Sequence, residues 1–275
     1  MEIIKEDCQV PVRSIVTYAQ PSDIEAGSAS LSLALDWAGE FKARVMLLTF
    51  PVDVLSAKMQ ASGEEAGLAA LHPVVAALAD RVGVPITVID RSSFAYGIGD
   101  VFADHLKVAD LGILSGQPGP LVGERLLAHA ALFDSGRPLV ILPRKGAVRL
   151  PRRTLIAWDG THVAAHAMQQ AIAVLPAGSE AIVARVTDDK ELRMGQSGIE
   201  AAHHLVRHGF KAEFQDIPRK GRAIHEALFD AATTAGADLI VAGAVRHSPL
   251  HEIIFGSVTG TVLDGDCPLP VLLSA

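Results

Sequence analysis

The chain has 275 residues, of which 49% are apolar and 20% charged, and its formal net charge at pH 7 is −7. Such a composition is typical of a folded protein, and the length fits two ordinary domains better than one large one. Nucleic acid is not an expected partner, because phosphate binding needs clustered Lys and Arg, and the densest basic stretch holds only Arg219, Lys220 and Arg222.

The start of the chain and its cysteines bear on localisation. Charged residues interrupt the first ten positions, where a signal peptide needs an apolar run. No apolar run approaches the ~18–20 residues that span a bilayer. Cys8 and Cys267 are the only cysteines and form no CxxC motif, which favours unpaired thiols in a reducing compartment. We therefore expect a cytoplasmic protein with no membrane partner.

In the first half, short β-branched runs alternate with longer Ala- and Leu-rich stretches, a pattern typical of a parallel sheet covered by helices. Strands are predicted at Val12–Tyr18, Arg44–Phe50, Pro85–Asp90, Leu111–Ser115 and Pro138–Leu142. The intervening helices are predicted at Ser22–Glu40, Glu64–Val82, Gly99–Lys107 and Leu121–Asp134. Pro and Gly then mark a linker at Pro143–Pro151.

The second half repeats this order. Its strands are predicted at Thr154–Trp158, Ala181–Thr187, Ala212–Gln215, Leu239–Ala242 and Val271–Leu273, and its helices at Ala164–Leu175, Ile199–His208, Gly221–Ala235 and Ser257–Leu263. Three short stretches also match by letters: those from Arg13 and Arg153, from Ala109 and Ala237, and from Pro138 and Pro270. The self-similarity predicts a duplicated α/β domain, residues 1–146 and 147–275.

The loop after the fourth strand of the second half is the strongest candidate for a site, because open parallel sheets bind ligands beyond the carboxyl ends of their strands. It begins at Gly243 and ends in Gly256, Ser257 and Val258. This stretch resembles the universal stress protein signature G-x-x-G-x9-G-[ST], which in ATP-binding members wraps the phosphates and ribose. Glycine lets backbone N–H groups approach an anion, and a helix start adds unsatisfied donors.

The resemblance implies a fold, a ligand and a role. The fold would be two tandem open five-stranded parallel sheets, each of strand order 3-2-1-4-5 and flanked by helices, Rossmann-like and similar to adenine nucleotide alpha hydrolases. The last strand of each half would meet the other, because either would otherwise leave an exposed edge. The ligand would be ATP or another adenine nucleotide, with Mg²⁺ as a candidate companion, and the role would be in stress adaptation.

Two further places match the family in the second half. Asp159 follows the first strand, where the family's aspartate faces the adenine and ribose pocket. An alternative for Asp159 and Thr161 is that they cap the helix that follows. Val186 lies at the end of the second strand, where the family uses main-chain atoms to contact adenine; its other interpretation is an ordinary core residue.

Arg246 stands where the signature has its second glycine. Its guanidinium could supply charge to a phosphate, or its side chain could fill the place that a phosphate would take. The two roles stay open, and with them the binding of ATP.

The first half lacks these features. Ala19 falls where Asp159 falls in the repeat, and Glu124 and Arg125 stand near the place of Gly256 and Ser257. We expect this half to bind no nucleotide and to pack against the second half as an intramolecular pseudo-dimer. A further homodimer is left open.

The histidines do not indicate a metal site or an enzyme. His204 and His208 are one helical turn apart, which suits chelation. The buried stripe of this helix is expected to be Ile199, Ala202, Leu205 and Val206, which leaves both histidines on a solvated face. His247 and His251 flank the loop without a nucleophile or an orienting carboxylate. No catalytic residue and no metal ligand is predicted.

Three functions of different classes follow. The first is a stress-response module whose second half binds an adenine nucleotide. The second is a degenerate scaffold that binds no nucleotide and acts through protein partners or an apolar ligand between the halves. The third is an adenine nucleotide hydrolase or an electron-transfer flavoprotein subunit; the hydrolase would need an SGGxDS-type loop after its first strand, which neither half has.

Overall fold

The computed structural model describes residues 12–20, 23–24, 27–49, 64–89, 97–116, 124–146, 148–187, 198–245 and 258–275. The first half of this part of the chain contains β1 (Ser14–Tyr18), α2 (Ala29–Phe41), β2 (Arg44–Leu48), α4 (Glu64–Val82), β3 (Ile86–Ile89), α5 (Ile98–Lys107), β4 (Leu111–Ser115), α6 (Glu124–Asp134) and β5 (Leu139–Leu142). The second half contains β6 (Arg153–Ala157), α7 (His162–Val174), β7 (Glu180–Thr187), α8 (Gly198–Arg207), β8 (Lys211–Pro218), α9 (Ile224–Thr234), β9 (Leu239–Gly243), α11 (Val258–Leu263) and β10 (Val271–Ser274).

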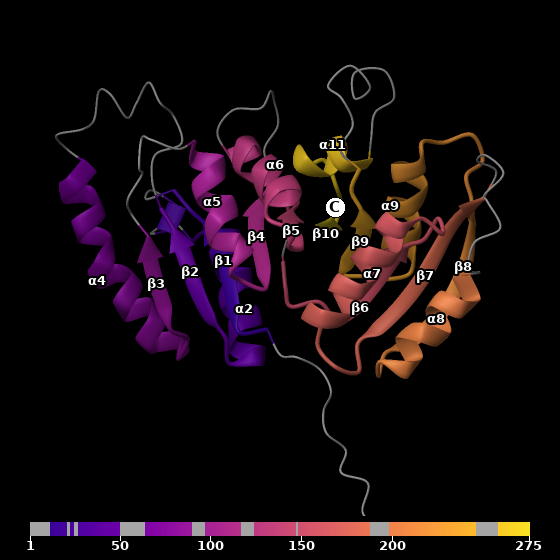
Figure 1. Ribbon diagram of the computed structural model, residues 1–275, viewed down its shortest axis with the longest axis horizontal. Helices are drawn as coiled ribbons and strands as arrows, with labels where there is room; N and C mark the ends of the chain where they lie inside the picture. The colour runs from indigo at the N-terminus through magenta and orange to yellow at the C-terminus, as the bar shows by residue number, and fades with distance from the viewer. Residues whose placement is uncertain are drawn as a thin grey trace, which may run out of the picture.

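The strands form one ten-stranded sheet in the order β3-β2-β1-β4-β5-β10-β9-β6-β7-β8, as Figure 1 shows. All neighbours are parallel except β5 and β10. Each half therefore has the predicted order 3-2-1-4-5, and the last strands meet as predicted. Their antiparallel pairing, in which Val140 lies opposite Leu272, joins the two five-stranded halves into a continuous sheet. The proposed division between residues 146 and 147 stays a prediction.

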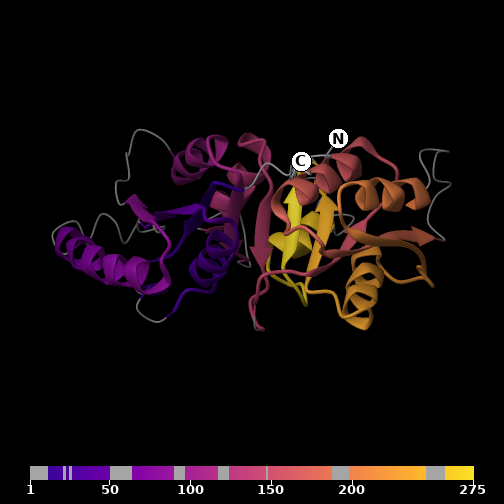
Figure 2. The ribbon, with the colours of Figure 1, turned by 90° about the horizontal axis from the view of Figure 1, so that it is seen from below.

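Helices cover both faces of the sheet in each half (Figure 2). Buried side chains of α2, α7 and α8 belong to one apolar layer, and those of α5, α6, α9 and α11 to the other. In β5, Val140 and Leu142 face the first layer, whereas Leu139 and Ile141 face the second. Strands buried on both faces have nearly continuous apolar sequences, which is why the strands could be predicted well from the sequence. Both layers extend across the two halves.

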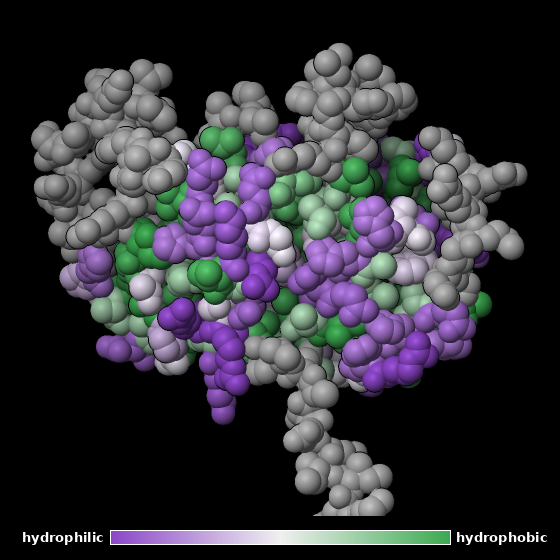
Figure 3. Space-filling view, viewed as in Figure 1, coloured by the Kyte–Doolittle hydropathy of each residue, from purple (hydrophilic) through white to green (hydrophobic). Residues whose placement is uncertain are grey.

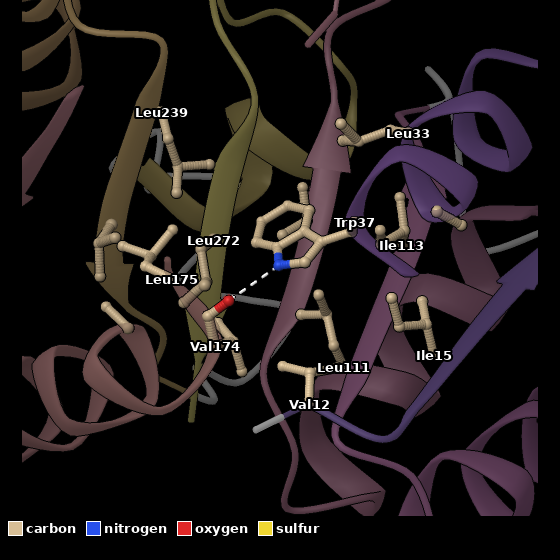
Figure 4. Close-up of a cluster of buried hydrophobic side chains, with 14 of the residues drawn as sticks. Val12, Ile15, Leu33, Trp37, Leu111, Ile113, Val174, Leu175, Leu239 and Leu272 are labelled. Atoms are coloured by element: carbon tan, nitrogen blue, oxygen red, sulfur yellow. Dashed lines mark hydrogen bonds between the residues drawn. The ribbon is translucent and has the colours of Figure 1, made fainter. Parts of the chain in front are cut away.

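A buried hydrogen bond joins the halves within the first layer (Figure 4). Trp37 of α2 is fully buried, and its indole N–H donates to the carbonyl oxygen of Val174 in α7 at 2.8 Å. A buried indole needs an acceptor, and the last carbonyls of a helix have no partner within that helix. One contact between the halves therefore satisfies both groups.

The Ala-Asp-Leu letters shared by the halves have a structural cause. The carboxylates of Asp110 and Asp238 each accept hydrogen bonds, 2.8–3.1 Å long, from two successive backbone N–H groups at the start of the first strand of their half: residues 13 and 14 for Asp110, and residues 152 and 153 for Asp238. Each aspartate thus fixes the start of a strand.

These bonds correct the alignment of the repeat by one residue. Ser14 is equivalent to Arg153, so Gln20, and not Ala19, occupies the position of Asp159 in the first half. The expected alignment was wrong because it matched the identical letters Arg13 and Arg153. The hydrogen bonds to Asp110 and Asp238 show that Arg13 is equivalent to Arg152.

Two predicted helices differ from expectation at a glycine. The helix predicted at Ser22–Glu40 is interrupted: Asp23 and Ile24 are helical, but Gly27 has a φ of +95°, and α2 begins at Ala29, where the Ser28 hydroxyl accepts a hydrogen bond from the N–H of Leu31 at 3.3 Å. The helix predicted from Gly221 begins at Ile224, since Gly221 also has a positive φ, +76°. In both places a left-handed glycine precedes the start of a helix.

The surface in Figure 3 mixes hydrophilic and hydrophobic residues, with hydrophilic side chains gathered over α8. Among the helices of the described ranges, none is long and apolar enough to cross a membrane.

Candidate functional site

The candidate site lies at the carboxyl ends of β6 and β9, which are adjacent parallel strands of the second half. The helix after β6, α7, packs on one face of the sheet, whereas α11, which follows β9, packs on the other. The helices α7 and α11 therefore lie on opposite faces of the sheet. Such a switch point is where open α/β sheets bind ligands.

Asp159 and Thr161 form a compact turn at the start of α7. The Asp159 Oδ1 accepts hydrogen bonds from the N–H of Thr161 at 2.9 Å and from its hydroxyl at 2.6 Å. The Thr161 Oγ1 in turn accepts from the N–H of Ala164 at 3.2 Å. Gly160 between them has a φ of +74°. The predicted helix cap is confirmed, and it holds an exposed carboxylate at the positive end of the α7 dipole.

Gly243 ends β9 against this same turn of α7. A Cβ on Gly243 would lie 2.8 Å from Val163 Cγ1, 2.9 Å from Val163 C and 3.0 Å from Ala164 N. The glycine that begins the signature is therefore required by helix packing. Its close approach brings the end of β9 beside the turn of Asp159 and Thr161.

Val186 lies in β7, the strand on the other side of β6. The last aligned pair of these strands is Ala157 with Ala184, so residues 185–187 extend past the end of β6. The Val186 side chain is half-buried in the second apolar layer, which confirms its interpretation as a packing residue. Main-chain contact with a ligand stays a prediction.

The remaining predicted residues belong to the loop and to α11. Val258 is the first residue of α11 and packs half-buried against the second apolar layer. Arg246, Gly256 and Ser257 lie outside the described residues, as do His247 and His251. The structure therefore brings together Asp159, Thr161 and Gly243, and places Val186 and Val258 on neighbouring elements.

In the first half, the position equivalent to Asp159 and the cap of the helix α2 lie apart in the chain. Gln20, which is exposed, occupies the position of Asp159. Asp23 and Ile24 shortly after it are helical, but α2 begins only after Gly27 and is capped by Ser28. In the second half, the capping Thr161 comes directly after Asp159 and Gly160. The first half thus has an amide in place of the carboxylate, and its Ser28 cap lies further along the chain from the end of the first strand.

No family model matches the sequence, and no curated protein matches it. The structure is similar to that of a universal stress protein from Archaeoglobus fulgidus DSM 4304, with 18% identity, 95% of each chain covered and a TM-score of 0.65. It is also similar to a putative universal stress protein from Pseudomonas aeruginosa UCBPP-PA14, with 18% identity, 96% of this chain and 93% of that chain covered, and a TM-score of 0.55.

This chain has the universal stress protein fold. The likeness covers 95–96% of this chain and therefore extends over both halves.

Within this universal stress protein fold, α8 differs from expectation. Of the expected buried stripe, Ala202 and Leu205 are buried, together with Gly198 and Ala201. Ile199 and Val206, expected in the same stripe, are each 50% exposed. The stripe is turned because Gly198 packs directly against the ring of Phe214, where a Cβ would collide.

His204 is correspondingly not fully solvated. Its Nε2 lies 2.7 Å from Gln169 Nε2 of α7, and burial, followed by the nearby His208 and Arg207, lowers the pKa of its imidazole. His208 is exposed, as predicted. In the described part of the chain, no group of three or more His, Cys, Asp or Glu side chains could hold a metal ion.

Cys267 is an unpaired, buried thiol, as predicted. Burial, together with the charge of Asp266, raises its pKa to about 12, so the thiol stays protonated and unreactive at neutral pH. Cys8 lies outside the described residues.

Two cavities of the described residues lie away from the candidate site. One of about 350 Å³ is at the amino ends of the strands, between Arg149 and Ser179. The other, of about 600 Å³, lies beside β8 and α9, between Glu213 and Asp230. Neither is lined by any predicted site residue.

Proposed function

We propose that this chain is a member of the universal stress protein family whose second half binds ATP or another adenine nucleotide and whose first half binds none. One observation carries the proposal: the turn of Asp159 and Thr161 lies against Gly243 at the switch point between β6 and β9. This arrangement sets an exposed carboxylate and a helix start together where the fold class binds its ligands.

Each residue would have a distinct role. Asp159 already receives the Thr161 N–H and hydroxyl at Oδ1, which fixes its carboxylate to accept from the hydroxyls of a ribose. The main chain of residues 185–187, beyond the end of β6, would contact the adenine. Gly256 and Ser257 would approach the phosphates, and Mg²⁺ would be held mainly by phosphate oxygens with few protein carboxylates, as is usual for this ion.

The proposed role is binding in stress adaptation, without catalysis. Among the described residues of the site, the hydroxyl of Thr161 is engaged by Asp159 and by the N–H of Ala164, and that of Thr187 donates to the Ile217 carbonyl oxygen. A nucleophile would need a general base in place of these partners.

Calorimetric titration with ATP, ADP, AMP and cyclic AMP tests the proposal. We expect one nucleotide per chain and an affinity at least about tenfold weaker for Asp159→Ala, a loss of about 1.4 kcal/mol. The matched control is Gln20→Ala, the equivalent change in the first half, which should leave the affinity unchanged. Two equivalent sites per chain, or an equal loss in both variants, would contradict the proposal.

Titration of Arg246→Gly separates the two roles of that residue. We favour phosphate contact, since a cation in a donor-rich loop is repelled unless an anion joins it; the variant should then bind about ten- to a hundredfold more weakly. Tighter binding would show that the arginine blocks the site.

The alternative function is a scaffold that acts through protein partners and binds no nucleotide. It is favoured by Gly243, whose packing against α7 accounts for the glycine without a ligand, and by cavities that lie elsewhere. Absence of binding by all four nucleotides, in a protein that folds normally, would select it.

A further inference from the structure

Contacts from the first half converge on residues 264–266, the turn that directly follows α11. The guanidinium of Arg125, in α6, forms an ion pair with Asp264, and that of Arg144, after β5, with Asp266. The backbone N–H of Arg144 also donates to the Gly265 carbonyl at 3.3 Å.

The backbones of the two halves also approach each other closely at this turn. Gly116, after β4, lies so close to Gly265 that a Cβ on Gly116 would collide with the Gly265 backbone. Gly265 itself has a φ of +70°, a conformation that other residues adopt only with strain. Both positions therefore require glycine for the halves to approach this closely.

The Arg125–Asp264 pair is shielded from water. The Arg125 side chain is 12% exposed and that of Asp264 31%, and the Nε and Nη1 of Arg125 and the Oδ1 of Asp264 are buried. A third ion pair between the halves, Arg152 with Glu40 at 3.0 Å, is more exposed and lies at the amino-terminal edge of the sheet. Removing one partner of a pair with buried charged atoms costs more than breaking an exposed pair, because the buried charge that remains is left without compensation.

We propose that Arg125 is a positioning residue, through which the first half holds α11 in place for the site of the second half. The helix has six residues and spans roughly 9 Å at 1.5 Å per residue, so fixing the turn at its end also fixes its first residue, Val258. This inference rests on the proposed function for its link to nucleotide, but not for the clamp itself. The half that binds no ligand thereby shapes the site of the half that does.

Hydrogen exchange of the unliganded protein tests the clamp. In Arg125→Met and in Asp264→Asn, the amides of residues 262–266, which are hydrogen-bonded within α11 and the turn after it, should exchange about tenfold faster than in the wild type, and the double variant should be no faster than the faster single variant. Arg152→Met is the matched control, because it breaks an ion pair between the halves at the opposite edge and should leave α11 unchanged. If Arg125→Met does not fold, Arg125→Lys and Asp264→Asn test the clamp instead. The lysine keeps the positive charge, so the exchange rate in Arg125→Lys should lie between those of the wild type and Asp264→Asn. Unchanged exchange of α11 in the clamp variants would overturn the proposal.

ATP titration of the same variants tests the link to the site. The clamp variants should bind at least about threefold more weakly, whereas Arg152→Met should bind as the wild type does. Faster exchange of α11 with unchanged affinity would overturn the positioning role. A wild type that binds no adenine nucleotide would refute the proposed function, and the exchange rates alone would then decide the clamp.

Discussion

At Gly243, the end of β9 touches the backbone of the first turn of α7, with less than 3 Å between an added Cβ and Val163. The residue matches a phosphate-loop signature, yet its neighbours are protein atoms. The motif and the packing are compatible, because the glycine that lets the helix approach also places the turn of Asp159 beside the end of β9.

Gly243→Ala should therefore lower the free energy of unfolding by about 1–3 kcal/mol, since the neighbouring atoms are backbone and a short side chain that cannot move aside cheaply. It should also weaken nucleotide binding by displacing the start of α7. Urea unfolding and titration measure the two effects. Gly39→Ala is the control: Gly39 lies within α2 with nothing within 4 Å of an added Cβ, so helix propensity should stabilise that variant by about 0.5–1 kcal/mol. Equal stability changes of the same sign in both variants would contradict the packing argument.

The elements themselves were largely predictable from the sequence, because strands buried on both faces leave long apolar runs and the helices between them are rich in Ala and Leu. Which face of each helix is buried was less predictable. In α8, Ile199 and Val206 are exposed while Ala201 and Ala202 are buried, since the face that carries Gly198 packs against the Phe214 ring. Hydrophobicity alone assigns the larger side chains to the core.

The site was predictable where it depends on neighbours in sequence, as with the cap made by Asp159 and Thr161. Contacts between the halves could not be predicted. Nothing in the sequence around Arg125 indicates Asp264 as its partner, and nothing around Trp37 indicates the carbonyl in α7 to which it donates. Pairing across the seam depends on how β5 meets β10, which only the assembled sheet determines.

Trp37→Phe should destabilise the protein by about 1–3 kcal/mol, because it leaves the Val174 carbonyl buried without its indole donor while retaining an aromatic ring in the layer. Chemical denaturation followed by circular dichroism measures the change. A volume-conserving control in the other layer, Met46→Leu, should cost less than about 1.5 kcal/mol. A loss for Trp37→Phe of under about 0.5 kcal/mol would mean that the bond between α2 and α7 contributes little.

At the scale of the molecule, both apolar layers continue through the seam, so neither half has a core of its own that is closed on that side. We expect the two halves to unfold together in one transition, with calorimetric and van't Hoff enthalpies that agree. Circular dichroism and fluorescence should give the same midpoint. Two resolved transitions, or midpoints that differ between these probes, would show that the halves are thermodynamically separate.

The sheet has ten strands, and its antiparallel pair sits at the centre. At that pair the carboxyl ends of the two halves point in opposite directions. Strands, however, rotate by roughly 20–25° from one neighbour to the next, and nine such steps accumulate to about half a turn. The rotation cancels the reversal, so that β2 and β3 on one side and β7 and β8 on the other all end toward the same side of the molecule in Figure 1. A single broad partner approaching from that side would meet the loop-bearing ends of both halves at once, the one that keeps Asp159 and the one that does not.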